Sequence, residues 1–211
     1  MEVVIEHLEP FLSKWLWLEY KHASQIAGRD NLTFTNVKDD WEYYKLSQIG
    51  RVEKASIVEL IENGVIGRED FIFLDPSYSS ILHPQDFKSR RGVVVGGILG
   101  DHPPRKRTRQ LLTSKLARCI ARSLGPHQFS IDGSVYMARQ VCLGFKLSEI
   151  PIQVGLTIKV NKFHEIYLPY AYPLVNGVPL VAPGLIEYLK SDEIVKDEEL
   201  LIRSGFVGRD F

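Results

Sequence analysis

The stretch Gly92-Val93-Val94-Val95-Gly96-Gly97-Ile98-Leu99-Gly100-Asp101-His102-Pro103-Pro104 decides the fold of this 211-residue chain. Residues 92–95, with three consecutive valines, predict a strand, and the following glycines predict a loop at the carboxyl end of that strand. Two other predicted strands, residues 71–74 and 117–122, also run into turn-forming sequence. Because helical patterns separate these strands, we expect an α/β fold with a parallel sheet and helices on both faces.

The other elements are predicted from hydrophobic periodicity and from helix start and stop signals. Strands are expected at residues 1–8, 32–37 and 152–160, and helices at 11–28, 54–63, 103–116, 131–143 and 185–190, with one or two helices within 38–68. The strict alternation in 152–160 suits an antiparallel or edge strand. Prolines begin the helix at residue 103, because proline is tolerated in the first helical turn. We predict a single domain over residues 1–211, whose charged end, residues 192–211, is mobile.

Composition is that of an ordinary globular protein, since 45% hydrophobic and 25% charged residues exclude a disordered or collagen-like chain. The longest uncharged apolar stretch, residues 92–100, is far shorter than the roughly 20 residues that a bilayer span needs. Met1 leads directly into acidic residues without a basic and apolar leader, so we expect a cytoplasmic protein. Cys119 and Cys142 lack the spacing of a zinc site or disulfide framework, so we expect buried thiols and no metal site.

Charge is unevenly distributed although the net charge is zero. Residues 87–122 carry ten bases against the single acid Asp101. Such a block attracts phosphate or carboxylate groups, or it forms solvated helix faces. Arg105, Lys106 and Arg107 are predicted in the first turn of a helix, where positive charge opposes the macrodipole by about 0.3 to 1 kcal/mol each. This placement predicts a compensating anion: a cofactor carboxylate, an acidic protein surface, an RNA phosphate, or Asp101 itself.

Three loops at successive strand ends, residues 74–76, 96–100 and 124–130, are the predicted binding site, because ligands of parallel sheets bind at the carboxyl ends of strands. Glycines there allow backbone groups to approach an adenine or ribose closely, although each loop taken alone is consistent with a tight turn. The motifs GxxxxGK[ST], GxGxxG, HExxH and GxSxG are absent. Nucleotide hydrolysis and NAD chemistry are therefore poor hypotheses.

The run from Val93 to Thr108, which contains Gly-Asp-His-Pro-Pro-Arg, resembles the signature of a family of SPOUT-class methyltransferases found in archaea and fungi. The fungal representative is a protein arginine methyltransferase acting on a small-subunit ribosomal protein. Residues 5–9, 15–20, 74–76 and 122–125 are similar to the same family. The resemblance implies a SPOUT-type parallel sheet flanked by helices with a C-terminal deep trefoil knot, and bent S-adenosylmethionine held by the three loops.

The resemblance also implies roles for individual residues. The cofactor-binding residues would be Leu74, Asp75, Pro76, Gly96, Gly97, Ile98, Gly100, Arg105, Leu124, Gly125, Gln128, Phe129 and Ser130. Arg105 would hold the methionine carboxylate. The catalytic candidates are Asp101, His102, Glu19 and Glu6. Asp101 is the first choice for orienting a guanidinium and accepting its proton, with helix capping as its alternative role; His102 would assist, and Glu6 and Glu19 would hold the target guanidinium.

Three functions remain open at this point. The first is S-adenosylmethionine-dependent methylation of a protein arginine, the partner being a small-subunit ribosomal protein. The second is methylation of tRNA or rRNA, since the basic block can line an RNA path, although acidic flanks would repel phosphate. The third is a non-catalytic ribosome-assembly binding protein that retains the knot. Whether the chain is a monomer or a homodimer, which arginine is the target and how many methyl groups are transferred are not specified by these residues.

Overall fold

A six-stranded, all-parallel sheet forms the centre of the computed structural model, which describes residues 1–100, 103, 105–160, 162 and 164–203. The strand order is β3-β2-β1-β5-β4-β6. The bounds are β1 Glu2–His7, β2 Leu32–Thr35, β3 Arg51–Val52, β4 Phe71–Leu74, β5 Gly92–Gly97 and β6 Ile120–Arg122. The predicted parallel sheet is confirmed.

Strand β5, the first part of the stretch 92–104, lies in the middle of the sheet and is buried on both faces. Val93 and Val95 belong to the core on one face of the sheet, and Val94 belongs to the core on the other. The three side chains are almost fully buried, so a continuous β-branched run suits this strand better than an alternating one. Residues 92–97 pair with β1 along its whole length, and residues 92–95 pair with β4.

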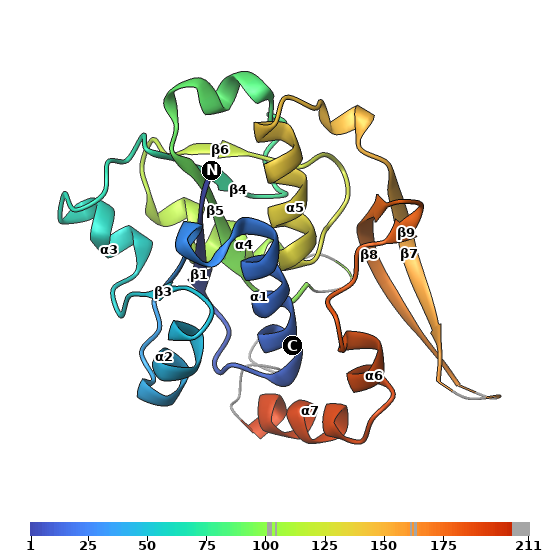
Figure 1. The fold of residues 1–211 in the computed structure, drawn as a ribbon. Coiled ribbons are helices and arrows are strands. Elements are labelled where there is room, and N and C mark those ends of the chain that lie inside the picture. Colours follow the sequence, from blue (N-terminus) through green and yellow to red (C-terminus); the bar gives the residue numbers. More distant parts are fainter. Residues whose placement is uncertain (101–102, 104, 161, 163, 204–211) are drawn as a thin grey trace.

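Helices cover both faces of the sheet (Figure 1). One face is covered by α1 Lys14–Ala27, α2 Asp40–Ser47 and α5 Ile131–Cys142. The other face is covered by α3 Ile57–Glu62 and by the segment that follows the short helix α4 Arg107–Leu111. Side-chain caps fix where the long helices begin: Ser13 accepts a hydrogen bond from the Leu16 amide, and Ser130 accepts one from the Gly133 amide. Short 3-10 turns span Arg29–Asn31, Pro84–Ser89, Thr113–Lys115 and Leu147–Glu149.

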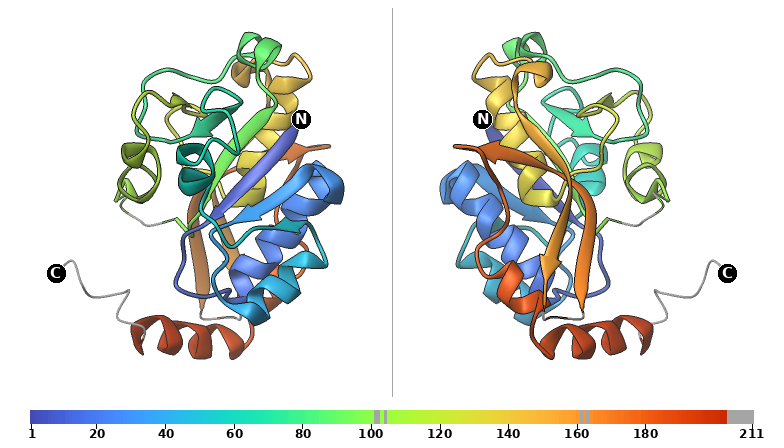
Figure 2. Two further views of the ribbon diagram at one scale, coloured as in Figure 1. Left: turned by 90° about the vertical axis from the view of Figure 1, so that its left-hand side faces the viewer. Right: turned by 90° about the vertical axis from the view of Figure 1, so that its right-hand side faces the viewer.

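An antiparallel sheet follows α5 and lies beside it (Figures 1 and 2). It contains β7 Ile152–Lys159, β8 Glu165–Val175 and β9 Val178–Pro179, and it leads into α6 Leu185–Leu189 and α7 Glu193–Arg203. Leu168 and Tyr172 of β8 pack with Leu185 and Leu189 of α6 in a separate core, to which Trp15 of α1 also contributes. The C-terminal elements are thus anchored on α1.

Several expectations were wrong in detail. The helix expected from residue 103 begins only at Arg107, so Arg105 and Lys106 precede it; Lys106 takes a left-handed conformation with φ of 58°. Of the three basic residues, only Arg107 therefore lies in the first turn of the helix, where positive charge opposes the macrodipole. Strand β6 begins at Ile120 and not at residue 117, and β3, β8, β9 and α7 were not predicted.

Cys119 and Cys142 are half-buried and form no disulfide, where fully buried thiols were expected. Burial still raises the pKa of the Cys119 thiol. Within the described part of the chain, no helix is both long and apolar enough to cross a membrane.

Candidate active site

The three predicted loops meet in one cavity at the carboxyl edge of the sheet. The space between the loops, counted together with its open mouth, has a volume of about 530 Å³. The first loop is residues 74–76, the second loop is residues 96–100 and the third loop is residues 124–130. Eight of the thirteen predicted cofactor residues line this cavity: Leu74, Asp75, Pro76, Gly96, Ile98, Leu124, Gln128 and Phe129. The predicted convergence of the loops is confirmed.

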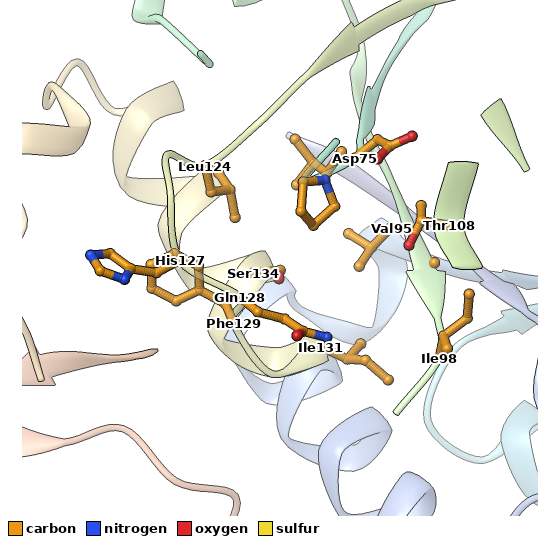
Figure 3. Close-up of a pocket in the computed structure, with 13 residues that line it drawn as sticks. Asp75, Val95, Ile98, Thr108, Leu124, His127, Gln128, Phe129, Ile131 and Ser134 are labelled. Atoms are coloured by element: carbon orange, nitrogen blue, oxygen red, sulfur yellow. The ribbon is translucent and has the colours of Figure 1, made fainter. Parts of the chain in front are cut away.

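Apolar and polar side chains both line this cavity (Figure 3). Leu124 and Phe129 of the third loop lie on one side, and Val95 and Ile98 lie across from them. The Asp75 carboxylate points away from the middle of the cavity in the same view. Apolar walls of this kind, with backbone groups between them, suit an aromatic base such as adenine.

The carboxylate of Asp75 is fully engaged within the protein. Its oxygens accept hydrogen bonds from the amide and hydroxyl of Ser77, at 2.8 and 2.7 Å, and from the hydroxyl of Thr113 at 2.5 Å. Only 1% of the residue is exposed. Asp75 therefore shapes the first loop and links it to the chain after α4.

A second cavity of about 720 Å³ adjoins the first and has a basic wall. Arg105, Lys106 and Arg107 line it together with Ser77 and Pro126. The two cavities share Asp75, Pro76, Ile98, Thr108, His127 and Gln128, so a ligand can extend from the apolar part into the basic part. A nucleoside attached to a carboxylate matches this arrangement in shape and charge.

Arg107 has its counter-charge inside the protein. It lies 3.2 Å from the Glu9 carboxylate, and the Glu9 side chain is only 6% exposed. Glu9 also accepts a hydrogen bond from the Leu99 amide at 2.8 Å, while Arg107 donates to the Leu99 carbonyl at 2.5 Å. Together, Glu9 and Arg107 bind both backbone groups of Leu99 and so fix the position of the second loop. Glu9 was not predicted to belong to the site, and Arg107 was predicted only as one of three basic residues that face an anion.

Four predicted cofactor residues line neither cavity. Gly97 packs against α1, where an added Cβ would overlap the Tyr20 hydroxyl and the Glu6 backbone carbonyl. Gly100 contacts Tyr170 of β8, Gly125 lies in the turn of the third loop, and Ser130 caps α5. The structure thus explains Gly97 and Ser130 by packing and capping and not by contact with a ligand.

Glu6 also takes a structural role in place of the predicted one. The residue is only 2% exposed, and its carboxylate accepts hydrogen bonds from the hydroxyls of Thr35 and Ser56, both at 2.5 Å, and from the Ile57 amide at 2.9 Å. These donors belong to β2 and to the start of α3. Glu6 therefore joins three elements of the fold and does not hold a guanidinium.

Glu19 lies beneath the cavity and does not line it. Its carboxylate accepts hydrogen bonds from the Ile131 amide at 2.9 Å and from the Trp15 indole at 2.7 Å, and Ile131 does line the cavity. Burial, and next the charge of nearby Asp132, raise the pKa of Glu19 from its ordinary 4.5 to about 8. Asp132 in turn lies 2.6 Å from Nδ1 of His22. This buried cluster fixes the start of α5, directly after the third loop.

Asp101 and His102, the first-choice catalytic residues, lie outside the described residues. Arg105 precedes α4 and lies on the basic wall of the second cavity. The sequence did not identify Val95, Thr108, Ile131 and Ser134 in the first cavity, nor Ser77 in the second. Leu99, Pro126 and His127 lie within the predicted loops, and Lys106 and Arg107 belong to the predicted basic run. Ile131 and Ser134 are one helical turn apart behind the third loop, a spacing that could have signalled them.

Solved structures identify the class of this fold and site. The yeast arginine methyltransferase SFM1 complexed with SAM matches with a TM-score of 0.77 and 27% identity, covering 92% of this chain and 91% of that one. The same enzyme complexed with SAH matches with a TM-score of 0.78 and 27% identity, over 90% and 94% of the chains. The fold and the site together define a methyltransferase.

Sequence comparison gives the family. The family described as "Protein arginine N-methyltransferase SFM1-like" matches residues 2–196, and this chain belongs to it. The protein arginine N-methyltransferase SFM1 of Saccharomyces cerevisiae is 27% identical over 220 residues, covering 96% of this chain and all of that protein. The dual specific Trm10 from Thermococcus kodakaraensis is 14% identical with a TM-score of 0.53, over 71% of this chain and 96% of that one, which shows a shared fold alone. The resemblance found in the sequence is confirmed.

Proposed function

We propose that this chain transfers a methyl group from S-adenosylmethionine to an arginine side chain of a small-subunit ribosomal protein in the cytoplasm. Membership of the SFM1-like family supports the arginine acceptor. The observation that carries the proposal is the junction, at the carboxyl edge of the sheet, of a loop-lined cavity that has apolar side chains on two sides with a cavity that has a basic wall. The ribosomal substrate rests on the resemblance of residues 93–108 to the archaeal and fungal family.

The residues present fit this cofactor. Leu74, Val95, Leu124 and Phe129 offer the apolar walls that an adenine needs, and Gly96 leaves the backbone accessible between them. Arg105, on the wall of the second cavity, would receive the methionine carboxylate through a charge-assisted hydrogen bond. When bound, the cofactor supplies an electrophilic methyl group, whose transfer to a guanidinium nitrogen leaves S-adenosylhomocysteine and one proton.

The chain's own task is to position the acceptor and to take that proton. A protonated guanidinium has no free lone pair, so a carboxylate beside it must orient it and accept the proton as the nitrogen attacks. Among the described carboxylates at the cavities, Asp75 already receives three hydrogen bonds and Glu9 binds Arg107 and Leu99. We therefore propose that Asp101 accepts the proton and that His102 assists it.

Labelling with tritiated S-adenosylmethionine tests the proposed substrate. The protein is incubated with ribosomal subunits purified from a strain that lacks its gene, and the products are digested separately with protease and with ribonuclease. We expect label in the small subunit that protease releases as methylarginine. Label released only by ribonuclease would identify an RNA methyltransferase, and binding to subunits without any label would identify an assembly protein.

We also propose that the chain from the second to the third loop is tied in the deep trefoil knot that the family resemblance implies. The strand order supports it, because β4 lies between β5 and β6 although β5 and β6 follow it in the chain. Pulling single molecules by their ends provides the test. A knotted chain yields a contour length shorter than the roughly 3.5 Å per residue of a fully extended one, and the full length would exclude the knot.

A further inference from the structure

The second and third loops are joined by one strand of the antiparallel sheet, although neither loop is adjacent to it in sequence. The hydroxyl of Tyr170 in β8 donates a hydrogen bond to the Gly100 carbonyl at 2.6 Å. The next residue, Ala171, donates its amide to the Gln128 carbonyl at 2.8 Å and bridges Phe129 in parallel register. Two consecutive residues of β8 therefore contact both loops.

Contacts on the second loop show that side chains from elsewhere determine its backbone path. The Leu99 amide binds Glu9, the Leu99 carbonyl binds Arg107, and the Gly100 carbonyl binds Tyr170. The Tyr170 ring and the Gln128 side chain also pack directly on Gly100. Glu9 and Arg107 hold one flank of the loop, and Tyr170 holds the other.

The position of these loops sets the width of the first cavity. Ile98 of the second loop and Gln128 and Phe129 of the third loop all line it. A loop that is already ordered spares a ligand the entropy of ordering it, which otherwise weakens binding. A contact that fixes both loops therefore increases the affinity of the cavity for its ligand, even when the contact does not touch the ligand.

We propose that Tyr170 is a positioning residue for the cofactor: its hydroxyl ties the second loop to β8, and β8 holds the third loop at Ala171. This inference rests on the proposed function, since it assumes that S-adenosylmethionine occupies the cavity between these loops. Tyr170 itself lines neither cavity. Its effect on the ligand is therefore transmitted through the Gly100 carbonyl.

The strand offers a matched control for the test. Tyr167 lies three residues before Tyr170 in β8, is 62% exposed, and lines neither cavity. Tyr170→Phe and Tyr167→Phe each remove one hydroxyl group from the same strand and leave the ring in place. Any difference between the two variants then reports the contacts of the Tyr170 hydroxyl, which include the hydrogen bond to the Gly100 carbonyl.

Three measurements on the full chain decide the proposal: calorimetric affinity for S-adenosylhomocysteine, melting temperature without ligand, and hydrogen exchange. For Tyr170→Phe we expect roughly threefold to tenfold weaker binding, the loss typical of one hydrogen bond. Exchange should be faster at residues 97–100, and the melting temperature should stay near that of the wild type. Tyr167→Phe should match the wild type throughout.

Wild-type affinity in Tyr170→Phe would overturn the proposal. So would weaker binding accompanied by faster exchange across α6 and the whole of β8, because the hydroxyl would then support the fold in general. A wild-type chain that binds no S-adenosylhomocysteine would overturn the proposed function first, and the role of Tyr170 with it.

Discussion

The parallel sheet and the antiparallel hairpin contribute to the site in different ways. Strands β1, β4 and β5 are buried on both faces, and the loops that follow β4 and β5 form walls of the cavity. The hairpin of β7 and β8 is half exposed, with Val154 and Tyr167 facing solvent, yet it contacts the second and third loops through Tyr170 and Ala171. The sheet therefore provides the stability of the fold, whereas the hairpin adjusts how well the site binds.

The largest effect should come from placing a methyl group inside the sheet. Gly97→Ala would drive a Cβ into the Tyr20 hydroxyl and the Glu6 carbonyl, which are both buried, so we expect a loss of roughly 3 kcal/mol in the free energy of unfolding. The control lies in the antiparallel sheet, at the turn between β8 and β9: Gly177→Ala, whose Cβ meets open space but whose φ is 79°. It should cost only about 1 kcal/mol. Equal losses in urea unfolding would contradict the contrast between the two regions.

A catalytic effect of similar size is expected at the end of the second loop. Asp101→Asn keeps the size of the side chain and removes its charge, so single-turnover methyl transfer at saturating cofactor should slow by roughly 100-fold or more. Affinity for S-adenosylhomocysteine, measured by calorimetry on the same variant, should be unchanged. A variant with wild-type turnover would exclude Asp101 as the proton acceptor.

A smaller effect should follow from removing charge at the basic wall. Arg105→Gln should weaken binding of S-adenosylmethionine about tenfold, because it loses a charge-assisted hydrogen bond to the carboxylate. Arg109→Gln is the matched control, since Arg109 is exposed on α4 and lines neither cavity. The difference between the variants should shrink in high salt. Tight, selective RNA binding lost in Arg105→Gln would favour an RNA substrate.

The last effect is a pH dependence of stability that concerns Glu19, which lies where the two regions meet. After burial itself, the charge of Glu19 is the next cause that raises the pKa of Tyr172 in β8. With a pKa of about 8 against an ordinary 4.5, folded Glu19 keeps a proton that the unfolded chain releases between these values. Stability contributed by this group is complete below pH 4.5 and is lost as pH rises towards 8.

Glu19→Gln should therefore flatten the decline of unfolding free energy between about pH 5.5 and 7.5, by about 1 kcal/mol per pH unit. Glutamine keeps an acceptor for the Ile131 amide. The exposed Glu62 of α3 provides the control, and Glu62→Gln should follow the wild-type slope. Parallel slopes for wild type and Glu19→Gln in urea unfolding would show that Glu19 is ionised in the folded protein. Glu19 would then carry a negative charge among its neighbours Trp15, His22, Asp132 and Tyr172.

The two regions also differ in how far the sequence predicts them. Strands β4 and β5 are predictable because burial on both faces leaves continuous apolar runs. Strand β8 was missed because Pro169 and Pro173 lie within it, and proline normally argues against a strand interior. The turn Asn176-Gly177, with φ of 53° and 79°, is a strong hairpin signal that could have located the end of β8.

The same contrast holds within the site. The loops that line the cavity follow directly from strand ends, so position along the chain predicts them. The contacts that hold the loops join residues far apart in sequence: Glu9 with Leu99 across 90 positions, and Tyr170 with Gly100 across 70. Periodicity and spacing describe neighbours along an element, so they contain no information about such pairs.

Because Ala171 contacts Gln128, the site can hold its cofactor firmly only after β8 has been synthesised. The parallel sheet is complete once Arg122 has been synthesised, but β8 reaches Ala171 only about 50 residues later. At about 5 to 20 residues per second, translation separates the two events by roughly 3 to 10 seconds. Chains that end between Arg122 and Ala171 would contain every strand of the parallel sheet but not the strand that joins the loops, and we expect them to hold cofactor poorly.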